Sequence, residues 1–350
     1  MSRYLASVWL MLTLDLRQRV RSTAWYVILG VYAAVLLVFS VGAAATVANW
    51  AGGGVLYSVV VYFVLLLATL VSPALSGTAI NGEREAGTLA TIQVTSITTG
   101  QIVLGKFLAA WATSLVFLAV SVPFLALGLA FGEISALTVL SSTLILAAEL
   151  GVLSAIGVGL SGLIRKPLFS VVVSYLVIAG LSIGTLLVFG IAGTLTQTPV
   201  KVTTIQSQWT TDPESGESTA LCDAPEVRYE TTPRYDLYWG FLAANPYVVV
   251  ADASARDFDQ YGTPRDVFGF IASGVRLAQQ TPEAEKTYDY CRSDSDGTPG
   301  ITAEESLRTG APSWFLGLAI QAALGAGALL GAWRATRAPS GRLGRESRIA

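Results

Sequence analysis

The chain alternates long apolar runs with short polar breaks. Six of the runs reach the length of about 20 residues that a helix needs to cross the hydrocarbon core of a membrane. They occupy residues 24–47, 55–80, 102–131, 136–164, 168–195 and 313–334. A polar segment of domain size, 196–312, separates the fifth run from the sixth. The pattern therefore predicts an all-α polytopic membrane protein with six transmembrane helices and a large insertion between helices 5 and 6.

Residues 1–23 precede the first run and are interrupted by charges, so they do not form a signal peptide. Apolar residues recur there at helical spacing, namely Leu5, Val8, Trp9, Leu12, Leu16 and Val20. Asp15 and Arg19 fall mostly outside that stripe. This indicates an amphipathic helix that lies in the membrane interface. A plain extension of the first span into the cytoplasm is the alternative.

Composition supports the membrane assignment and narrows the chemistry. Only 13% of the 350 residues are charged, whereas soluble domains carry about 25%. The chain has no histidine, which removes His metal ligands and Ser-His-Asp triads. No metal-ligand cluster and no nucleophile–base pair stands out in the sequence. We therefore expect no catalytic residue, no metal site and no nucleic-acid binding.

The basic residues predict the orientation of the spans. Thirteen of the 22 Lys and Arg lie in short segments on one side, and the short loops 48–54 and 132–135 on the other side hold none. Basic residues mark the cytoplasmic side. Both termini are then cytoplasmic, and the 196–312 segment is extracytoplasmic. The tail 335–350 is basic and is expected to lie against anionic lipid headgroups.

The break between the second and third runs, residues 81–101, is charged and is followed closely by Lys106. A charge in the middle of a bilayer costs roughly 3 kcal/mol or more, so this segment emerges into water. Asn81 can cap a short helix there, with Glu83 and Glu85 in its first turn. A compact charged helix on one membrane face is either a docking surface or a solvated connector.

This loop resembles that of the ABC-2 type transporter permeases, the membrane subunits of ATP-driven exporters. The resemblance is carried by Gly82, Glu83, Arg84, Glu85, Gly87, Thr88 and Leu89, then by Thr95-Ser96-Ile97, Ile102 and Gly105-Lys106. The chain departs from the family pattern at Ala90, where Glu is usual, and at Ser96, where Pro is usual.

The resemblance implies that the loop helix docks in a cleft of a separate ATPase subunit and couples it to the spans through residues 82–89. It further implies a dimer with a second permease copy or a paralogue in a cell membrane, in keeping with a bacterial inner membrane. Arg165 and Lys166 are a candidate second contact with the ATPase. ATP and Mg²⁺ would bind to that partner, because the run from Gly100 to Lys106 lacks the Ser or Thr of a P-loop.

Glu149 lies near the middle of the fourth run, where an acidic residue is costly. It is either a functional acid, contacting substrate or relaying protons, or a hydrogen-bonded group that helps helix packing. If Glu149 is a functional acid, the chain could belong to a different class of transport protein, a proton-coupled secondary transporter or a channel. A third hypothesis makes the 196–312 segment the functional part, a binding or assembly module that the spans anchor.

The insertion contains both cysteines, Cys222 and Cys291, which predicts one disulfide on the oxidising side. Its two apolar stretches, 235–250 and 267–277, are interrupted or too short to cross a bilayer. Short re-entrant or interfacial helices, common at this place in the resembled family, are expected for both.

Overall fold

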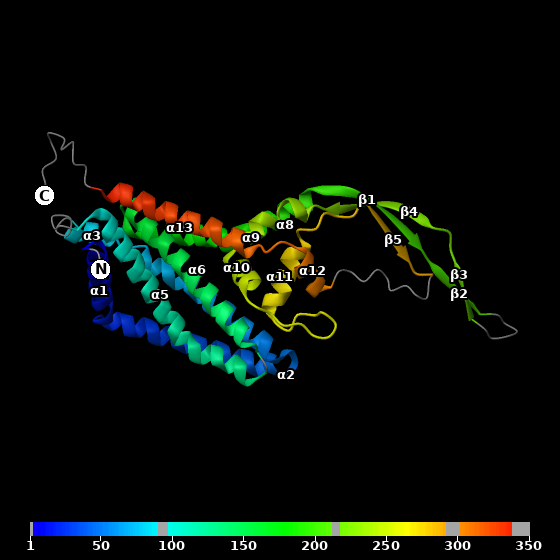
Figure 1. Ribbon diagram of the computed structural model, residues 1–350, viewed down its shortest axis with the longest axis horizontal. Coiled ribbons are helices and arrows are strands. Elements are labelled where there is room, and N and C mark those ends of the chain that lie inside the picture. The colour runs from blue at the N-terminus through cyan, green and yellow to red at the C-terminus, as the bar shows by residue number, and fades with distance from the viewer. Residues whose placement is uncertain (1–2, 90–96, 133, 212–217, 292–301, 338–350) are drawn as a thin grey trace.

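The computed structural model describes residues 3–89, 97–132, 134–211, 218–291 and 302–337. It is mostly helical, and six helices are long and apolar enough to cross a membrane. These are Thr23–Thr46, Gly52–Glu85, Thr99–Ala130, Ala136–Leu163, Pro167–Leu195 and Trp314–Thr336. The six predicted spans are thus present as long apolar helices, side by side in one bundle (Figure 1).

Two of the spans belong to α2 (Thr23–Ser76), which folds back on itself at a glycine turn. Gly52 has φ 76°, a left-handed conformation that favours glycine. The next residue, Gly53, lies so close to Gly132 that a Cβ would overlap its backbone. The two turns at this end of the bundle, one within α2 and one after α5 (Thr99–Ala130), therefore pack against each other.

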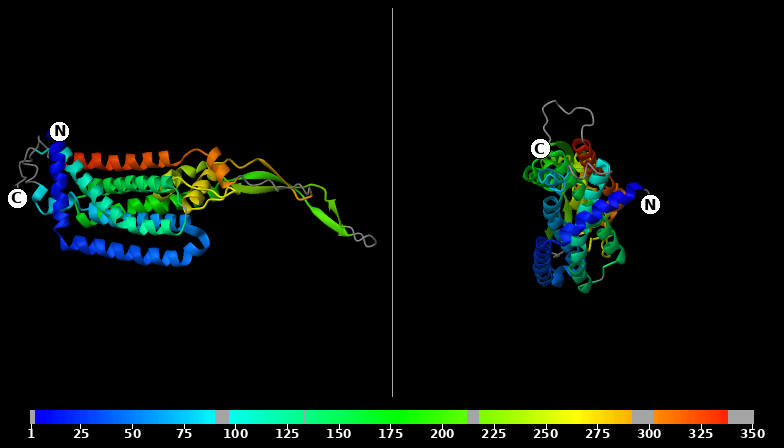
Figure 2. Two further views of the ribbon diagram at one scale, coloured as in Figure 1. Left: turned by 60° about the horizontal axis from the view of Figure 1, so that its bottom comes forward. Right: turned by 90° about the vertical axis from the view of Figure 1, so that its left-hand side faces the viewer.

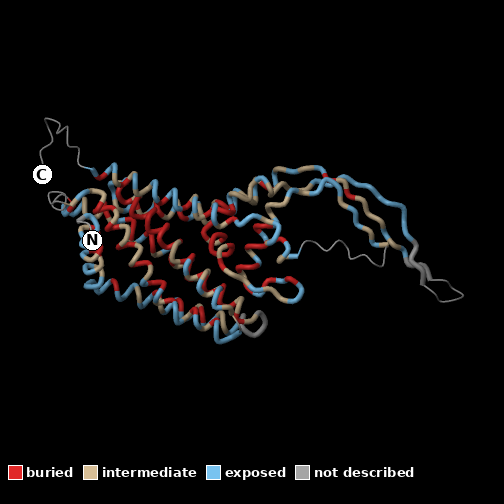
Figure 3. Tube along the Cα trace, viewed as in Figure 1, coloured by how far each residue is buried: buried red, intermediate tan, exposed pale blue. Residues whose placement is uncertain are grey.

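The core lies where α2, α5 and α6 (Ala136–Leu163) meet, and Leu36, Val60 and Leu146 are fully buried there. Figure 3 shows the buried residues along the bundle axis. The fifth span is far more exposed and consists of α7 (Pro167–Ala179), the π-helix η1 (Gly180–Gly184) and α8 (Thr185–Leu195). Its apolar surface needs a hydrocarbon medium or another protein to cover it.

The sixth span, α13 (Trp314–Thr336), packs directly on α6. Side chains on Gly159 and Gly162 of α6 would overlap Ala328 and Ala332 of α13. Small residues on both helices thus allow close approach of the two backbones. The two helices therefore share a close-packed interface.

The insertion differs from the all-α fold that we predicted, because it contains β-structure. A three-stranded sheet has the order β4-β1-β5, with β1 (Gln197–Ile205) antiparallel to β4 (Glu226–Pro233) and parallel to β5 (Glu285–Asp289). A hairpin of β2 (Ser207–Thr211) and β3 (Ser218–Cys222) follows β1. Together they form an arm that projects beyond the bundle (Figures 1 and 2). β1 is rich in Val and Thr, whose branched side chains favour strands.

The rest of the insertion is a group of short helices at the base of the arm (Figure 1). The group comprises η2 (Tyr235–Leu237), α9 (Trp239–Ala243), α10 (Pro246–Ala253), α11 (Val267–Leu277) and α12 (Ala303–Thr309). The two apolar stretches are thus helical, as expected. The first is broken by Asn245, whose side chain accepts a bond from the Tyr247 amide (2.9 Å) and caps α10.

The N-terminal helix α1 (Arg3–Val20) runs crosswise over the end of the bundle opposite the insertion (Figures 1 and 2). The apolar stripe predicted to lie in the membrane interface is divided between two sides of the helix. Val8 and Leu12 are buried, whereas Trp9 is 60% exposed. The buried side packs on α5 and also carries Asp15, which is only 9% exposed and makes a charged contact described next.

Candidate functional site

The short helix α3 (Asn81–Glu85) lies at the same end of the bundle as α1, at the end of the second span (Figure 1). We predicted that Asn81 would cap this helix, but Asn81 is its first helical residue and makes no cap. Its Nδ2 instead donates to the Ile164 carbonyl (3.1 Å). The Ser161 hydroxyl of α6 accepts bonds from the Ile80 amide (2.9 Å) and the Asn81 amide (3.2 Å). The start of α3 is therefore fixed to the end of α6.

Four charged side chains form what we call the α3-end cluster: Asp15, Arg19, Glu83 and Lys106. Lys106 is 4% exposed, and its Nζ lies 2.7 Å from Asp15 Oδ1 and also pairs with Glu83. Arg19 pairs with Asp15 (3.3 Å) and donates to the Leu75 carbonyl (3.2 Å). The charge of Lys106 is thus compensated although its side chain is buried. The cluster joins α1, α2, α3 and α5.

The seven residues of the predicted coupling motif divide into two faces. Glu83 points inward to Lys106, and Leu89 is buried. Gly82 and Arg84 are half-buried, while Glu85, Gly87 and Thr88 are exposed. Gly87 has φ 73°, which ends the helix as a left-handed glycine does. Of the other motif residues, Ala90, Thr95 and Ser96 lie outside the described residues.

A hollow of about 390 Å³ opens beside α3, between α1 and the end of α2. Glu83 and Lys106 lie in its wall. The second carboxylate oxygen of Glu83 is buried and has no hydrogen-bond partner within the part of the chain that the structure describes. The candidate second contact, Arg165 and Lys166, is exposed in the connector that follows Ile164. This end of the bundle thus presents a mixed, charged surface around α3.

Glu149 is fully buried in α6, facing α13. Neither carboxylate oxygen makes a hydrogen bond of normal geometry within the described residues, and none of the ion pairs found there involves it. The carboxamide of Gln321 lies within interaction range, but its Nε2 donates to the Ala244 carbonyl (3.0 Å). An ionised carboxylate without a partner is very costly at this depth, so the geometry fits a neutral carboxyl group.

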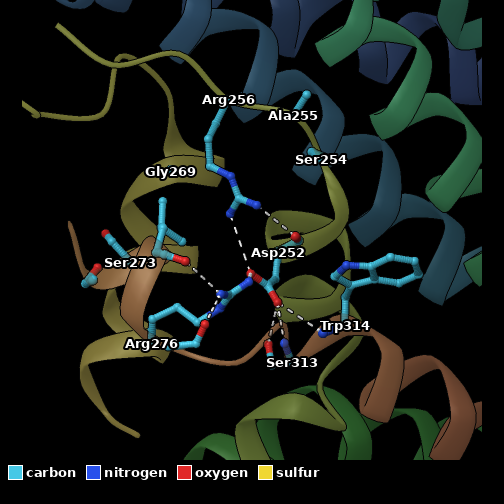
Figure 4. Close-up of polar contacts among 12 residues, drawn as sticks. Asp252, Ser254, Ala255, Arg256, Gly269, Ser273, Arg276, Ser313 and Trp314 are labelled. Atoms are coloured by element: carbon cyan, nitrogen blue, oxygen red, sulfur yellow. Dashed lines mark hydrogen bonds and ion pairs between the residues drawn. The ribbon is translucent and has the colours of Figure 1, made fainter. Parts of the chain in front are cut away.

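A second charged group, the insertion-end cluster, surrounds Asp252 of α10 (Figure 4). Asp252 Oδ1 pairs with Arg276 of α11 (2.7 Å) and Arg256 (3.5 Å). Asp252 Oδ2 accepts from the Ser313 amide (2.6 Å), the Ser313 hydroxyl (2.9 Å) and the Trp314 amide (3.1 Å). A single buried carboxylate therefore joins α10 and α11 to the start of α13, where the helix dipole favours negative charge.

Burial shifts the ionisation of two neighbours of this cluster. It lowers the pKa of the Arg256 guanidinium, an effect that Asp252 partly opposes. It raises the pKa of Asp266 to about 6, although the Gly269 amide donates to that carboxylate (2.7 Å). Asp266 caps α11, so its charge state bears on how the short helices are held.

The disulfide between Cys222 and Cys291 is present, as predicted, and the two Cα atoms lie 5.5 Å apart. It joins the end of β3 to the segment that follows β5. Because Cys222 lies opposite Ser207, the bond closes the arm where the β2–β3 hairpin begins. This bond restrains chain segments that bury little apolar surface of their own.

Sequence reasoning missed both charged clusters. Lys106 follows the predicted start of the third span, and the cost of a charge there signals that it needs a partner. Arg276 similarly lies in an apolar helix. The sequence does not show which residues these partners are. Asp15 is 91 residues from Lys106 in the chain, and Asp252 is 24 residues from Arg276.

The fold and these sites define a mostly helical, membrane-embedded protein with a charged helix at one end and an inserted arm at the other. No group of acidic residues and cysteines in the described parts of the chain could hold a metal ion. No protein-family model matches the chain, and no curated protein matches it.

Proposed function

We propose that the chain is the permease subunit of an ABC-2 type ATP-driven exporter, located in the cell membrane of a bacterium with both termini in the cytoplasm. A separate subunit binds and hydrolyses ATP, and a second permease copy or paralogue completes the pore. The observation that carries the proposal is the division of the α3 segment into an anchored face and an exposed face. Glu83 fixes the helix to the bundle, while Glu85 and Gly87 are exposed at its end and would contact the partner.

The contacts of α3 give the proposal a mechanical route. Lys106 links α3 to α5, and Ser161 links it to α6. Because α6 packs closely on α13, a force on α3 reaches three spans. An ATPase that binds α3 differently in its nucleotide states would shift the spans between two arrangements. Arg165 and Lys166 follow Ile164, whose carbonyl accepts a hydrogen bond from Asn81 of α3, and they would extend the contact.

The test is binding between the purified chain and a co-expressed ABC ATPase encoded by a neighbouring gene. Glu85→Lys reverses a charge on the exposed face and should abolish co-purification and ATP-driven transport. Glu226→Lys, on an exposed strand of the arm, is the matched control and should leave both unchanged. Full binding by the Glu85→Lys protein would exclude α3 as the docking element.

Glu149 supports a second candidate, a proton-coupled secondary transporter or channel. The specific observation is a fully buried carboxyl group that no cation of the described residues pairs with. Transport would then stop when the proton gradient is collapsed and continue when ATP is depleted. Glu149→Gln keeps the size and hydrogen-bonding capacity of the group but cannot exchange a proton, so it should abolish that transport.

A further inference from the structure

A hollow of about 730 Å³ opens between the start of α1, the start of α5 and the last turns of α13. These three parts meet at the end of the bundle where α3 lies (Figure 1). The hollow shares no lining residue with the one beside α3, so it is a separate feature of this end. Its volume lies in the range of about 300–1,000 Å³ that is usual for small-molecule sites.

Two polar side chains meet at Gly100, in the first turn of α5. A Cβ at this position would lie 3.3 Å from the Tyr4 hydroxyl oxygen and 3.7 Å from Trp333 Nε1. Both polar groups therefore border the space that the glycine leaves open. Neither group makes a hydrogen bond within the part of the chain that the structure describes. The hollow thus offers two hydrogen-bonding groups that the described fold does not use.

The hollow also carries a positive charge. Arg337 lies in its wall, with the guanidinium carbon 4.9 Å from the centre of the Trp333 ring. None of the ion pairs among the described residues involves Arg337, and no described acidic residue lines the hollow. A guanidinium and an indole N–H only donate hydrogen bonds, and the Tyr4 hydroxyl can donate as well. A set of donors around one cation complements an anion.

The other wall of the hollow is apolar and consists of Val103, Leu104, Leu329 and Leu330. Leu330 is 57% exposed, and the outer surface of α13 remains apolar further along the span, at Leu324. Trp and Tyr side chains, such as the pair at Gly100, are enriched at the boundary between lipid headgroups and hydrocarbon. The hollow therefore joins a cationic, donor-rich part at that boundary to an apolar part on the hydrocarbon side.

We propose that this hollow binds one anionic phospholipid. Its phosphate accepts hydrogen bonds from Arg337, Trp333 and Tyr4, and one acyl chain lies along Leu330. A phosphatidylcholine brings a quaternary ammonium group with its phosphate, and no carboxylate among the described lining residues compensates that charge. The net charge of the headgroup therefore decides the affinity. The site differs from a general attraction of the basic tail to anionic headgroups, and it does not depend on an ATPase partner.

The experiment uses the full-length protein alone, purified in detergent and titrated with phosphatidylglycerol or with phosphatidylcholine of the same acyl chains. Native mass spectrometry counts the lipid molecules bound at each concentration. The first molecule of phosphatidylglycerol should bind about fivefold more tightly than phosphatidylcholine, the effect of one basic residue on an anionic headgroup. Glycerol 3-phosphate, which has the phosphate but no acyl chain, should not displace it at millimolar concentration.

Arg337→Gln should abolish the preference for phosphatidylglycerol. Arg334→Gln is the matched control and should retain that preference, because Arg334 is exposed near the same end of α13 but does not line the hollow. Trp333→Phe and Tyr4→Phe each remove one donor and keep an aromatic ring. Each should weaken the binding of both lipids about fivefold, the effect of one hydrogen bond, without changing the preference between them.

Any of three results would overturn the proposal. Equal affinity of the wild-type protein for the two lipids would mean that the charge of the hollow selects no headgroup. An equal loss of preference in Arg334→Gln and Arg337→Gln would assign the effect to the overall charge of the span end. Displacement of the lipid by glycerol 3-phosphate would show that the hollow binds a soluble phosphate and that the apolar wall contributes nothing.

Discussion

The two charged clusters lie at opposite ends of the bundle (Figure 1) and are built in different ways. In the insertion-end cluster, both oxygens of Asp252 have partners: two guanidinium groups lie at Oδ1, and three donors at the start of α13 bond to Oδ2. Arg256 Nη1 and Arg276 Nε make no hydrogen bond among the described residues. In the α3-end cluster, Lys106 joins two carboxylates, but one oxygen of Glu83 has no partner within the described residues. The α3-end cluster also borders a hollow of about 390 Å³ beside α3.

This difference indicates two roles. A carboxylate whose hydrogen bonds are all made within the chain stabilises one arrangement strongly, because any movement exposes unsatisfied charges. A cluster with an unused acceptor and adjacent space can change partners at a smaller cost. We therefore interpret the insertion-end cluster as a clamp and the α3-end cluster as a joint. The predictions below test that contrast, from the largest expected effect on stability to the smallest.

Removing the clamp should have the largest effect. Asp252→Ala leaves Arg276, 5% exposed at its side chain, without its counter-charge. The expected loss in the free energy of unfolding is about 3–5 kcal/mol, measured by denaturant or thermal unfolding in detergent. Glu304→Ala breaks an exposed pair with Arg308 and should cost less than about 1 kcal/mol. Equal effects of the two substitutions would show that Asp252 is no clamp.

Removing the centre of the joint should cost less. Lys106→Met removes the cation that pairs with Glu83, whereas Asp15 keeps its pair with Arg19 (3.3 Å). Glu83 is 21% exposed at its side chain and borders the hollow, so part of the lost interaction can be replaced by water. We expect a loss of about 2–3 kcal/mol. Neutralising one carboxylate as well, in Lys106→Met with Glu83→Gln, should recover about 1 kcal/mol. A double variant that recovers nothing would make this cluster as closed as the other.

Acidification should stabilise the insertion end through Asp266. Its pKa is raised from 3.8 to about 6 by burial, so the folded protein binds a proton that the unfolded chain still lacks at pH 5–6. Stability from this group is present at low pH and is lost as pH rises through about 6. Between pH 7 and pH 5 the gain is about 1 kcal/mol. Asp266→Asn should abolish that difference, and an unchanged pH profile in the variant would assign the effect to other carboxylates.

The two ends of the bundle also differ in how much of their structure could be predicted from the sequence. The six spans follow directly from apolar runs, since hydrocarbon demands continuous hydrophobic helices. The exposed face of α3 followed from its charges and its family resemblance. The sequence could not show that Glu83 points inward, because that contact depends on α1, which runs crosswise and brings Asp15 to Lys106. Likewise β1 shows alternating burial at Val200 and Val202, a strand signal that the polar composition of the insertion obscured.

The smallest effect on stability is expected at the exposed face of α3, where the effect on binding of the proposed ATPase should be largest. Glu85 is exposed, so Glu85→Ala should change the free energy of unfolding by less than about 0.5 kcal/mol. The same substitution should weaken binding of the proposed ATPase about tenfold, the loss expected when a charged contact at an interface is removed. Asp252→Ala should show the opposite result: a large loss in the free energy of unfolding, but normal affinity for the ATPase in the fraction of the protein that is folded. Surface binding assays on both variants test this, and a parallel loss of affinity in the two proteins would mean that the clamp and the joint are one mechanical unit.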